Sequence, residues 1–224
     1  MILAAASNLS KKRNAVSSLN TGLISYYDSG ATDRKGSNDL TAVNAPTTGT
    51  GIVSASCMSF ASASSQGYKL LDASAGDFEP NQTMSYACWF KATTLTTYMM
   101  LHSKGSSADS RSYVFSDGAM TTNWGSGKTI ASAGSTITTG TWYHMLVSWN
   151  ASTNTLSRSI NGATPSTTTG AASPANSADF NIGYQTSFFY WDGLIDQFCL
   201  WHRELTSGER SELYGSGSGI DFLV

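Results

Sequence analysis

The amino-acid sequence predicts an all-β fold, and two observations carry the prediction. Charged residues make up 12% of the 224 residues and hydrophobic residues 40%, with 21 glycines and much serine and threonine; this is typical of short strands joined by uncharged polar loops. The stretch Met84–Lys91 alternates along its length, with Met84, Tyr86, Cys88 and Phe90 on one face. We expect that face to point into the interior of a β-sandwich.

The other strands are expected in chain order from residue 21. Short apolar segments between turn residues predict strands over Leu23–Asp28, Met58–Phe60, Gly67–Leu70, Tyr98–His102, Tyr113–Phe115, Thr141–Trp149, Leu156–Ile160 and Phe180–Gly183. Asn161-Gly162 favours a tight turn, because both residues tolerate positive φ. Residues 163–177 are low in complexity, and we interpret them as a long loop.

The C-terminal region predicts a last strand and one short helix. After a turn at Asp192-Gly193, the segment Leu194–Trp201 carries apolar residues on both faces, so we expect a buried strand. Thr206 and Glu209 have the spacing of a capping box, in which each side chain accepts a hydrogen bond from the other residue's backbone N–H. Gly215 then supplies a left-handed end for the helix.

This closing region resembles the signature of the laminin-G-like, concanavalin A-like jelly-roll domains. The resemblance is carried by Asp192-Gly193-Leu194-Ile195-Asp196-Gln197, Leu200-Trp201, Leu205-Thr206, Glu209 and Leu213-Tyr214, and upstream by Gly140–Val147 and Phe180–Gly183. It covers roughly residues 21 to 217. It implies a two-sheet antiparallel β-sandwich, a jelly roll with one short helix near the C-terminus.

We predict a single globular domain with short flanking segments. Residues 1–20 are interpreted as an N-terminal arm, residues 21–219 as the laminin-G-like jelly-roll domain, and residues 220–224 as a C-terminal tail. The arm contains a basic run, Lys11-Lys12-Arg13, which is either solvated or docks on an anionic partner.

Charge and hydropathy bear on partners and location. The formal net charge of -2 disfavours nucleic-acid binding through a basic face, and no apolar run reaches the ~20 residues that span a bilayer. Met1–Ala6 is apolar but lacks a basic lead and is too short for a secretory core, so no signal peptide is visible. Together with the resemblance to extracellular modules, this suggests an extracellular or virion-surface protein.

The sequence does not favour catalysis. Some relatives of this fold are glucanases that use an E-x-D-x-E strand, and this chain contains no such trio. The glutamates near the C-terminus, Glu204, Glu209 and Glu212, lie on the closing turn and helix, where capping and solvation are their natural roles. His102, His144 and His202 are isolated from one another, so we expect structural histidines and no enzyme activity.

The family resemblance implies a calcium ion. Laminin-G-like relatives often bind Ca²⁺ through carboxylates and backbone carbonyls on loops. The matching candidates here are Asp28, Asp33 and Asp196, which would meet if the first and last strands are neighbours. The alternative is that these carboxylates cap turns and pair with Arg34 or Arg203.

A crowded set of aromatic residues suggests a binding surface. The candidates are Tyr184, Phe188, Phe189, Tyr190 and Trp191 in one loop and Trp124 in a glycine-rich loop. Sugar rings stack their C–H faces on aromatic planes, but aromatic side chains serve protein interfaces and cores equally well. Core packing, a protein interface and a glycan site therefore stay open for this set.

Two functions follow as hypotheses. The first is a non-catalytic binding or adhesion domain that recognises a glycan or a protein surface. The second is a phage or viral structural protein, a capsid decoration or fibre subunit, acting as a homo-oligomer or on a capsid partner.

Overall fold

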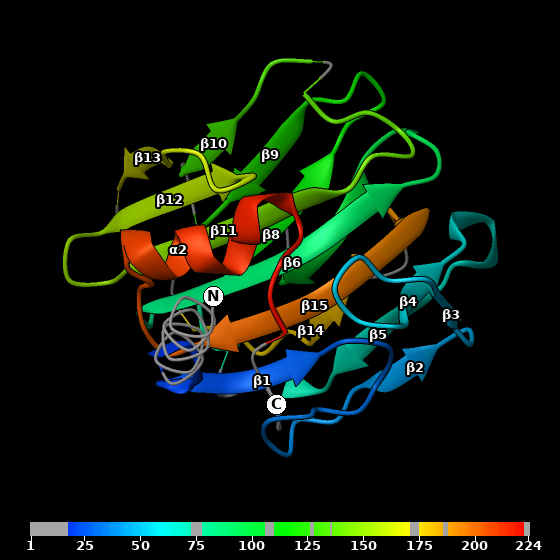
Figure 1. Ribbon diagram of the computed structural model, residues 1–224, viewed down its shortest axis with the longest axis horizontal. Helices are drawn as coiled ribbons and strands as arrows, with labels where there is room; N and C mark the ends of the chain where they lie inside the picture. Colours follow the sequence, from blue (N-terminus) through cyan, green and yellow to red (C-terminus); the bar gives the residue numbers. More distant parts are fainter. Residues whose placement is uncertain are drawn as a thin grey trace, which may run out of the picture.

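The computed structural model describes residues 18–72, 78–105, 110–125, 128–134, 136–170, 175–185 and 188–221. Two antiparallel sheets pack face to face, with sheet A in front and sheet B behind in Figure 1. The predicted all-β, two-sheet sandwich is confirmed. Residues 1–17, most of the predicted arm with its basic run, lie outside the described part of the chain.

Sheet A contains eight strands among the described residues. Their order across the sheet is β13 (Ser166–Thr169), β12 (Thr155–Ile160), β11 (Tyr143–Asn150), β6 (Met84–Ala92), β15 (Gly193–Trp201), β4 (Cys57–Phe60) and β3 (Thr47–Gly49), and β1 (Leu23–Tyr27) pairs with β15. The last strand therefore lies near the middle of the sheet, between strands from the first half of the chain.

Sheet B contains seven strands in the described ranges. Their order is β10 (Thr129–Ala131), β9 (Met120–Asn123), β8 (Ser110–Val114), β7 (Met99–Lys104), β14 (Phe180–Ile182), β5 (Gly67–Leu70) and β2 (Thr41–Val43). A 3-10 turn, η1 (Ser62–Ser64), lies between β4 and β5.

The main hydrophobic core lies between the two sheets. Sheet A contributes Met84, Tyr86, Cys88 and Phe90 from β6, the four residues that the alternation places inside. Sheet B contributes Leu101 from β7 and Phe180 and Ile182 from β14, together with apolar residues of neighbouring strands. Burial of large side chains at roughly 1.5–3 kcal/mol each is the main stabilising contribution.

The outer face of sheet A is covered by a second hydrophobic cluster. The helix α2 (Ser207–Tyr214) lies across β11 and β6 in Figure 1, and its Leu213 packs with Leu146 and Trp201 of the sheet. Since β15 supplies residues to both clusters, its apolar pattern on two faces is explained. The capping box of Thr206 and Glu209 and the left-handed Gly215 are present as predicted, and η4 (Gly215–Gly217) follows.

The segments flanking the predicted domain also pack onto sheet A. Leu19 is fully buried in the second cluster, and its carbonyl accepts a hydrogen bond from Trp201 Nε1 at 2.7 Å. Ile220 packs against the same cluster, and its carbonyl accepts a hydrogen bond from Gln197 Nε2 at 3.1 Å. The folded domain therefore extends beyond residues 21–219 at both ends.

Five strands were not predicted from the sequence. They are β2, β3, β10 and β13, which form the edges of the two sheets, and β9, which lies between β8 and β10. The side chains of the four edge strands are mostly small, polar and exposed, so no apolar alternation marks them. The strand β13 lies inside the segment interpreted as a long loop, which corrects that interpretation.

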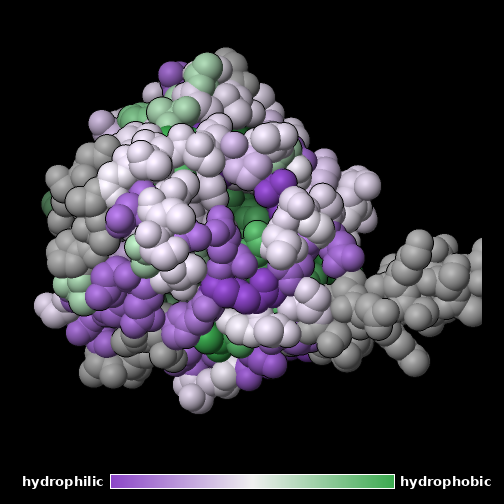
Figure 2. Space-filling view, turned by 90° about the vertical axis from the view of Figure 1, so that its left-hand side faces the viewer, coloured by the Kyte–Doolittle hydropathy of each residue, from purple (hydrophilic) through white to green (hydrophobic). Residues whose placement is uncertain are grey.

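The side of the molecule at the left of Figure 1 has a mostly polar surface. Figure 2 shows this side, where hydrophobic residues appear as small separate areas among hydrophilic ones. No helix in the described residues is long and apolar enough to cross a membrane.

Candidate functional site

A continuous row of polar residues crosses the outer face of sheet B. Neighbouring strands pair these residues one to one, and laterally paired residues share a face of the sheet. In order, the polar row is Thr41, Lys69, Asn181, Ser103, Arg111, Asn123 and Thr129. Because the residues on either side of Asn181, Phe180 and Ile182, lie in the core, the row faces away from the core.

Several polar atoms of this row have no hydrogen-bond partner within the part of the chain that the structure describes. Asn181 Oδ1, Arg111 Nε and Asn123 Oδ1 are shielded from solvent and unpaired among the described residues. Asn181 is 2% exposed and uses its amide nitrogen to donate to Ser103 Oγ at 3.2 Å. Buried polar groups are nearly always satisfied in native proteins, so such atoms mark places for ordered water or a ligand.

An aromatic cluster adjoins the polar row on the same sheet. It consists of Tyr98, Tyr113, Phe115, Phe188 and Phe189, and neighbouring ring centroids lie 4.9–6.2 Å apart. Phe188 is 67% exposed, Phe189 39% and Tyr98 36%. Exposed aromatic side chains on one patch are typical of a binding surface.

Two residues of the aromatic cluster hold an unusual backbone conformation. Tyr98 has φ 50° and Phe189 has φ 60°, and their ring centroids lie 5.1 Å apart. A left-handed conformation of a bulky residue costs free energy and tends to occur at functional sites. The fold therefore presents these two rings together despite local strain.

Arg111 joins the polar row to the aromatic cluster. Its guanidinium carbon lies 4.9 Å from the centroid of the Tyr113 ring, and its Nη1 donates to Gln185 Oε1 at 3.3 Å. Gln185 in turn donates to the Gly105 carbonyl at 3.3 Å. The cation is held in place by an aromatic face and an amide.

The predicted aromatic candidates divide into core and surface residues. Trp124 and Trp191 are fully buried; Trp124 Nε1 donates to the Pro80 carbonyl at 2.8 Å, and Trp191 packs edge-on against Phe90. Their burial corrects the assignment of these tryptophans to a binding surface. Among the other candidates, Tyr184 is 7% exposed and stacks on the half-buried Tyr190, while Phe188 and Phe189 are exposed.

The predicted calcium ligands do not form one site. Among the described residues, no three acidic, histidine or cysteine side chains gather around a common point. Asp28 accepts a hydrogen bond from Arg34 Nη1, and Asp33 accepts backbone N–H groups of Tyr26 and Lys35 at 3.0 Å. These two carboxylates serve a turn and an ion pair, so the expectation that they meet Asp196 in a calcium site is corrected.

Asp196 instead anchors a loop over sheet A. Its Oδ2 accepts the backbone N–H groups of Ile52 and Val53 at 2.9 Å and of Ser54 at 3.2 Å. Burial raises the pKa of this carboxyl, and the three N–H groups act in the opposite direction. Oδ2 therefore holds the backbone of residues 52–54, while Oδ1 is buried and has no hydrogen-bond partner among the described residues.

A polar pocket lies at the end of β1. It has a volume of about 380 Å³ and is lined by Asp28, Ser29, Gly30, Thr32 and Arg34. Its two charged groups, Asp28 and Arg34, form an ion pair with each other. Because these charges are mutually satisfied, the pocket offers less to a ligand than the polar row does.

A histidine and a serine lie close together in the core. His102 Nε2 is 3.3 Å from Ser110 Oγ, while His102 Nδ1 accepts the backbone N–H of Ser112 at 3.1 Å. The second bond requires Nδ1 to be unprotonated, so in the neutral ring Nε2 carries the proton and donates to Ser110. Burial lowers the pKa of His102 to about 3. This geometry does not make His102 a base for Ser110.

Family comparison agrees with the sandwich. The model of the concanavalin A-like lectin/glucanases superfamily matches residues 63–209, and the chain belongs to this family. Among curated proteins, no match is found.

Solved structures with the same fold include binding domains and enzymes. Domain 4 of AbnA, an extracellular GH43 arabinanase from Geobacillus stearothermophilus in complex with arabinotriose, has a TM-score of 0.66 and 19% identity over 84% of this chain and 96% of that chain. The binding domain of Paraclostridial Mosquitocidal Protein 1 has a TM-score of 0.68 and 15% identity over 88% of this chain and 53% of that one.

A third similar structure is a much larger enzyme. Trypanosoma rangeli sialidase in complex with sialic acid has a TM-score of 0.63 and 15% identity, and the match covers 90% of this chain and 34% of the sialidase. This chain thus spans about half of the mosquitocidal binding domain and a third of the sialidase. These similarities show that the chain shares the fold of the three structures.

Proposed function

We propose that this domain is a non-catalytic carbohydrate-binding module and that its site is the outer face of sheet B. The observation that carries the proposal is the polar row lying beside the aromatic cluster, with Arg111 between them. Aromatic faces bind the C–H faces of sugar rings, and amides, hydroxyls and a guanidinium exchange hydrogen bonds with sugar hydroxyls.

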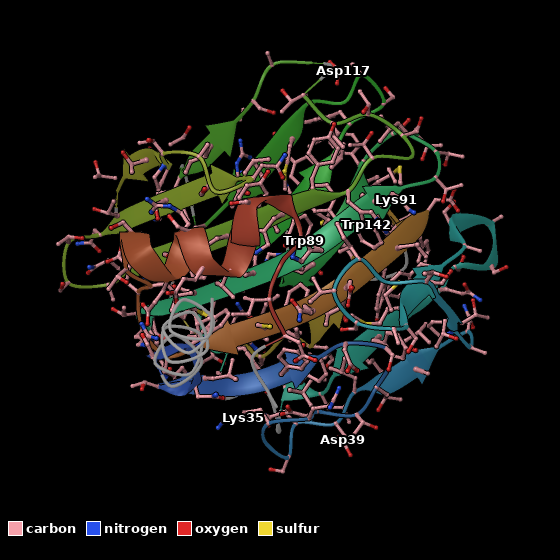
Figure 3. All side chains as sticks on the ribbon, in the orientation of Figure 1. Lys35, Asp39, Trp89, Lys91, Asp117 and Trp142 are labelled. Atoms are coloured by element: carbon pink, nitrogen blue, oxygen red, sulfur yellow. The ribbon has the colours of Figure 1, made fainter. Side chains whose placement is uncertain are left out.

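The opposite sheet supports this choice of face. The outer face of sheet A is covered by α2 and by the loop that Asp196 holds, and Trp89 packs there against Tyr214 at 5.8 Å. Figure 3 shows Lys91 and Trp142 on the same side, where Lys91 Nζ lies 4.9 Å from the Trp142 ring centroid. That pair is a single cation–π contact, and the residue paired with Lys91 on β15 is the apolar Leu194.

The fold relatives favour a saccharide as the ligand. The structure of the arabinanase domain contains arabinotriose, and this domain matches almost the whole of that chain. The absence of an E-x-D-x-E strand and the tautomer of His102 favour binding without hydrolysis.

A glycan array with matched variants tests the proposal. The wild-type domain should bind at least one saccharide class, Tyr98→Ala should weaken that binding by about tenfold, and Trp142→Ala should leave it unchanged. Tyr98 lies in the aromatic cluster, whereas Trp142 lies on the outer face of sheet A. No binding to any saccharide, or equal loss in both variants, would contradict the proposed site.

The exposed phenylalanines favour a second candidate, a protein interface. Phe188 and Phe189 are adjacent, exposed and unable to form side-chain hydrogen bonds. A protein partner, such as another copy of the chain or a capsid subunit, would cover them with apolar surface. Mass measurement in solution, with and without Phe188→Ser, separates this candidate from the first: a closed oligomer that dissociates in the variant would favour it.

A further inference from the structure

Arg111 is a cation on the proposed binding face, and the described carboxylates near this face belong to other ion pairs. Lys69, the other cation of the polar row, lies 3.6 Å from Asp179 Oδ2. In contrast, no carboxylate among the residues that the structure describes lies within ion-pair distance of Arg111, whose side chain is only partly buried. Among the described residues, the Arg111 guanidinium on the outer face of sheet B therefore has no carboxylate to neutralise it.

The guanidinium also has unused hydrogen-bonding capacity. Of its several N–H donors, Nη1 bonds to Gln185, and Nε is shielded without an acceptor. The Tyr113 ring and Gln185 hold the planar group in one orientation, which reduces the entropy lost when it binds a ligand. A fixed guanidinium plane is the geometry that binds a carboxylate through two parallel hydrogen bonds.

We propose that the saccharide bound by this face carries a carboxylate, as uronic acids do, and that Arg111 binds that carboxylate. The inference rests on the proposed function and names its substrate class. The sugar ring packs on the aromatic cluster, and its carboxylate lies over Arg111 at the border with the polar row. Asn123 pairs directly with Arg111, and Asn181 lies beyond Ser103 on the other side; each has an unsatisfied amide oxygen that could bond to a hydroxyl group or a bridging water.

Uronate polymers and their methyl esters test the inference directly, because esterification removes the charge and keeps the sugar backbone. The probes are polygalacturonate, alginate and hyaluronan, each with its carboxylates free and each fully methyl-esterified. We expect the wild-type domain to bind at least one free-acid polymer about tenfold more tightly than its ester, and this preference to shrink as salt is added.

Variants of Arg111 test whether this residue causes the preference for the free acid. Arg111→Gln keeps a polar side chain and should abolish the preference for the acid, so that acid and ester bind this variant with equal affinity. Arg111→Lys keeps the charge without the planar fork and should retain part of the preference. The control is Lys35→Gln, which removes an exposed cation at the far end of the molecule, at the bottom of Figure 3, and should change nothing.

The outcomes separate the inference from the proposed function. Equal affinity for acid and ester, or an acid preference that survives Arg111→Gln in a folded variant, overturns the role of Arg111 while saccharide binding stands. Binding only to neutral saccharides on the glycan array overturns the acidic class in the same way. Failure to bind any of these polymers and any saccharide on the array overturns both.

Discussion

The guanidinium carbon of Arg111 lies 4.9 Å from the centroid of the Tyr113 ring, two residues further along β8. Both side chains leave the same face of sheet B, because the residue between them, Ser112, is directed to the core and bonds to Tyr86 there at 2.9 Å. One strand thus supplies both the charged and the aromatic part of the proposed site. Predictions for that site and for the surrounding fold follow from this arrangement.

Replacing Phe189 with glycine should weaken saccharide binding without destabilising the fold. Phe189 is 39% exposed and has φ 60°, so glycine removes the ring and also relieves a strained backbone. We expect saccharide affinity to fall by about tenfold while the urea midpoint stays the same or rises. Calorimetric titration and urea unfolding measure the two effects; a parallel loss of both would show that Phe189 is a structural residue.

Removing the Asp196 carboxylate should strongly destabilise the domain. Asp196→Ala leaves three backbone N–H groups, those of Ile52, Val53 and Ser54, without their acceptor. Each lost bond costs about 1 kcal/mol, so we expect a loss of at least about 3 kcal/mol in the free energy of unfolding. Urea unfolding measures it, with Glu212→Ala on the exposed side of α2 as the control. A change no larger than that of the control would refute the anchoring role.

Asp196→Ala also tests whether this carboxylate binds a calcium ion, as the family resemblance implies. Three of the protein's own N–H groups bind Oδ2 of the wild-type carboxylate, and Oδ1 is shielded from solvent, so we expect the midpoint of thermal unfolding to be the same in EDTA and in excess Ca²⁺. A midpoint raised by Ca²⁺ in the wild type and unchanged in Asp196→Ala would instead assign a calcium ion to this residue.

Two buried histidines should make the domain less stable in mild acid. Burial lowers the pKa of His102 and of His144 from 6.5 to about 3. Below pH 6.5 the unfolded chain therefore binds protons that the folded chain does not, and stability that is complete above pH 6.5 is lost as the pH falls. Two such groups give a loss of about 2.7 kcal/mol per pH unit.

Urea unfolding between about pH 7.5 and about pH 5 measures this slope. His144 packs between Trp89 and Tyr214, and His144→Phe should remove about half of the slope because it removes one of the two protons. Free energies of unfolding that do not change over this range would contradict the neutral, buried state of both histidines.

Removing the Glu209 side chain should lower the free energy of unfolding more than removing the Thr206 cap alone. Thr206→Ala removes the hydrogen bond to the Glu209 backbone N–H and should cost about 1 kcal/mol. Glu209→Ala also leaves Arg203 without its two bonds of 2.7 and 2.8 Å to the carboxylate, so a loss of about 3 kcal/mol is expected. Equal losses in the free energy of unfolding for the two substitutions would show that the ion pair of Arg203 and Glu209 adds no stability.

The stability that Glu209 contributes should be lost at a lower pH than the stability that the two buried histidines contribute. Burial raises the pKa of Glu209, but hydrogen bonds from Arg203, Ser18 and Thr206 together outweigh it and lower the pKa from 4.5 to about 2. The stability from this group is complete above pH 4.5 and is lost as the pH falls toward 2, so Glu209→Ala should lessen the acid sensitivity only below pH 4.5.

The sequence predicts the layers of this fold well, because burial leaves a readable pattern. The alternation in β6 and the two apolar faces of β15 both reflect which side chains the two sheets and α2 cover. The edge strands β2, β3, β10 and β13 leave no such pattern, since their partners are backbone groups and their side chains are mostly solvated.

The candidate site was predicted only in part, through Phe188 and Phe189. The polar row depends on register between six pairs of strands, some of them far apart in the chain, as in the pairing of Asn181 with Lys69 and with Ser103. A slip of one residue would turn such a row toward the core, and no local pattern reports that register. Trp124 and Trp191 show the converse, because an aromatic residue in a loop sequence can still complete the core.

The most direct test of the central claim is to map the bound saccharide by amide chemical shifts, using the tightest ligand from the glycan array. We expect the shifts to concentrate on β8, β9 and β14 and around Tyr98 and Phe189. Shifts confined to the outer face of sheet A, or to the pocket between Asp28 and Arg34, would contradict it.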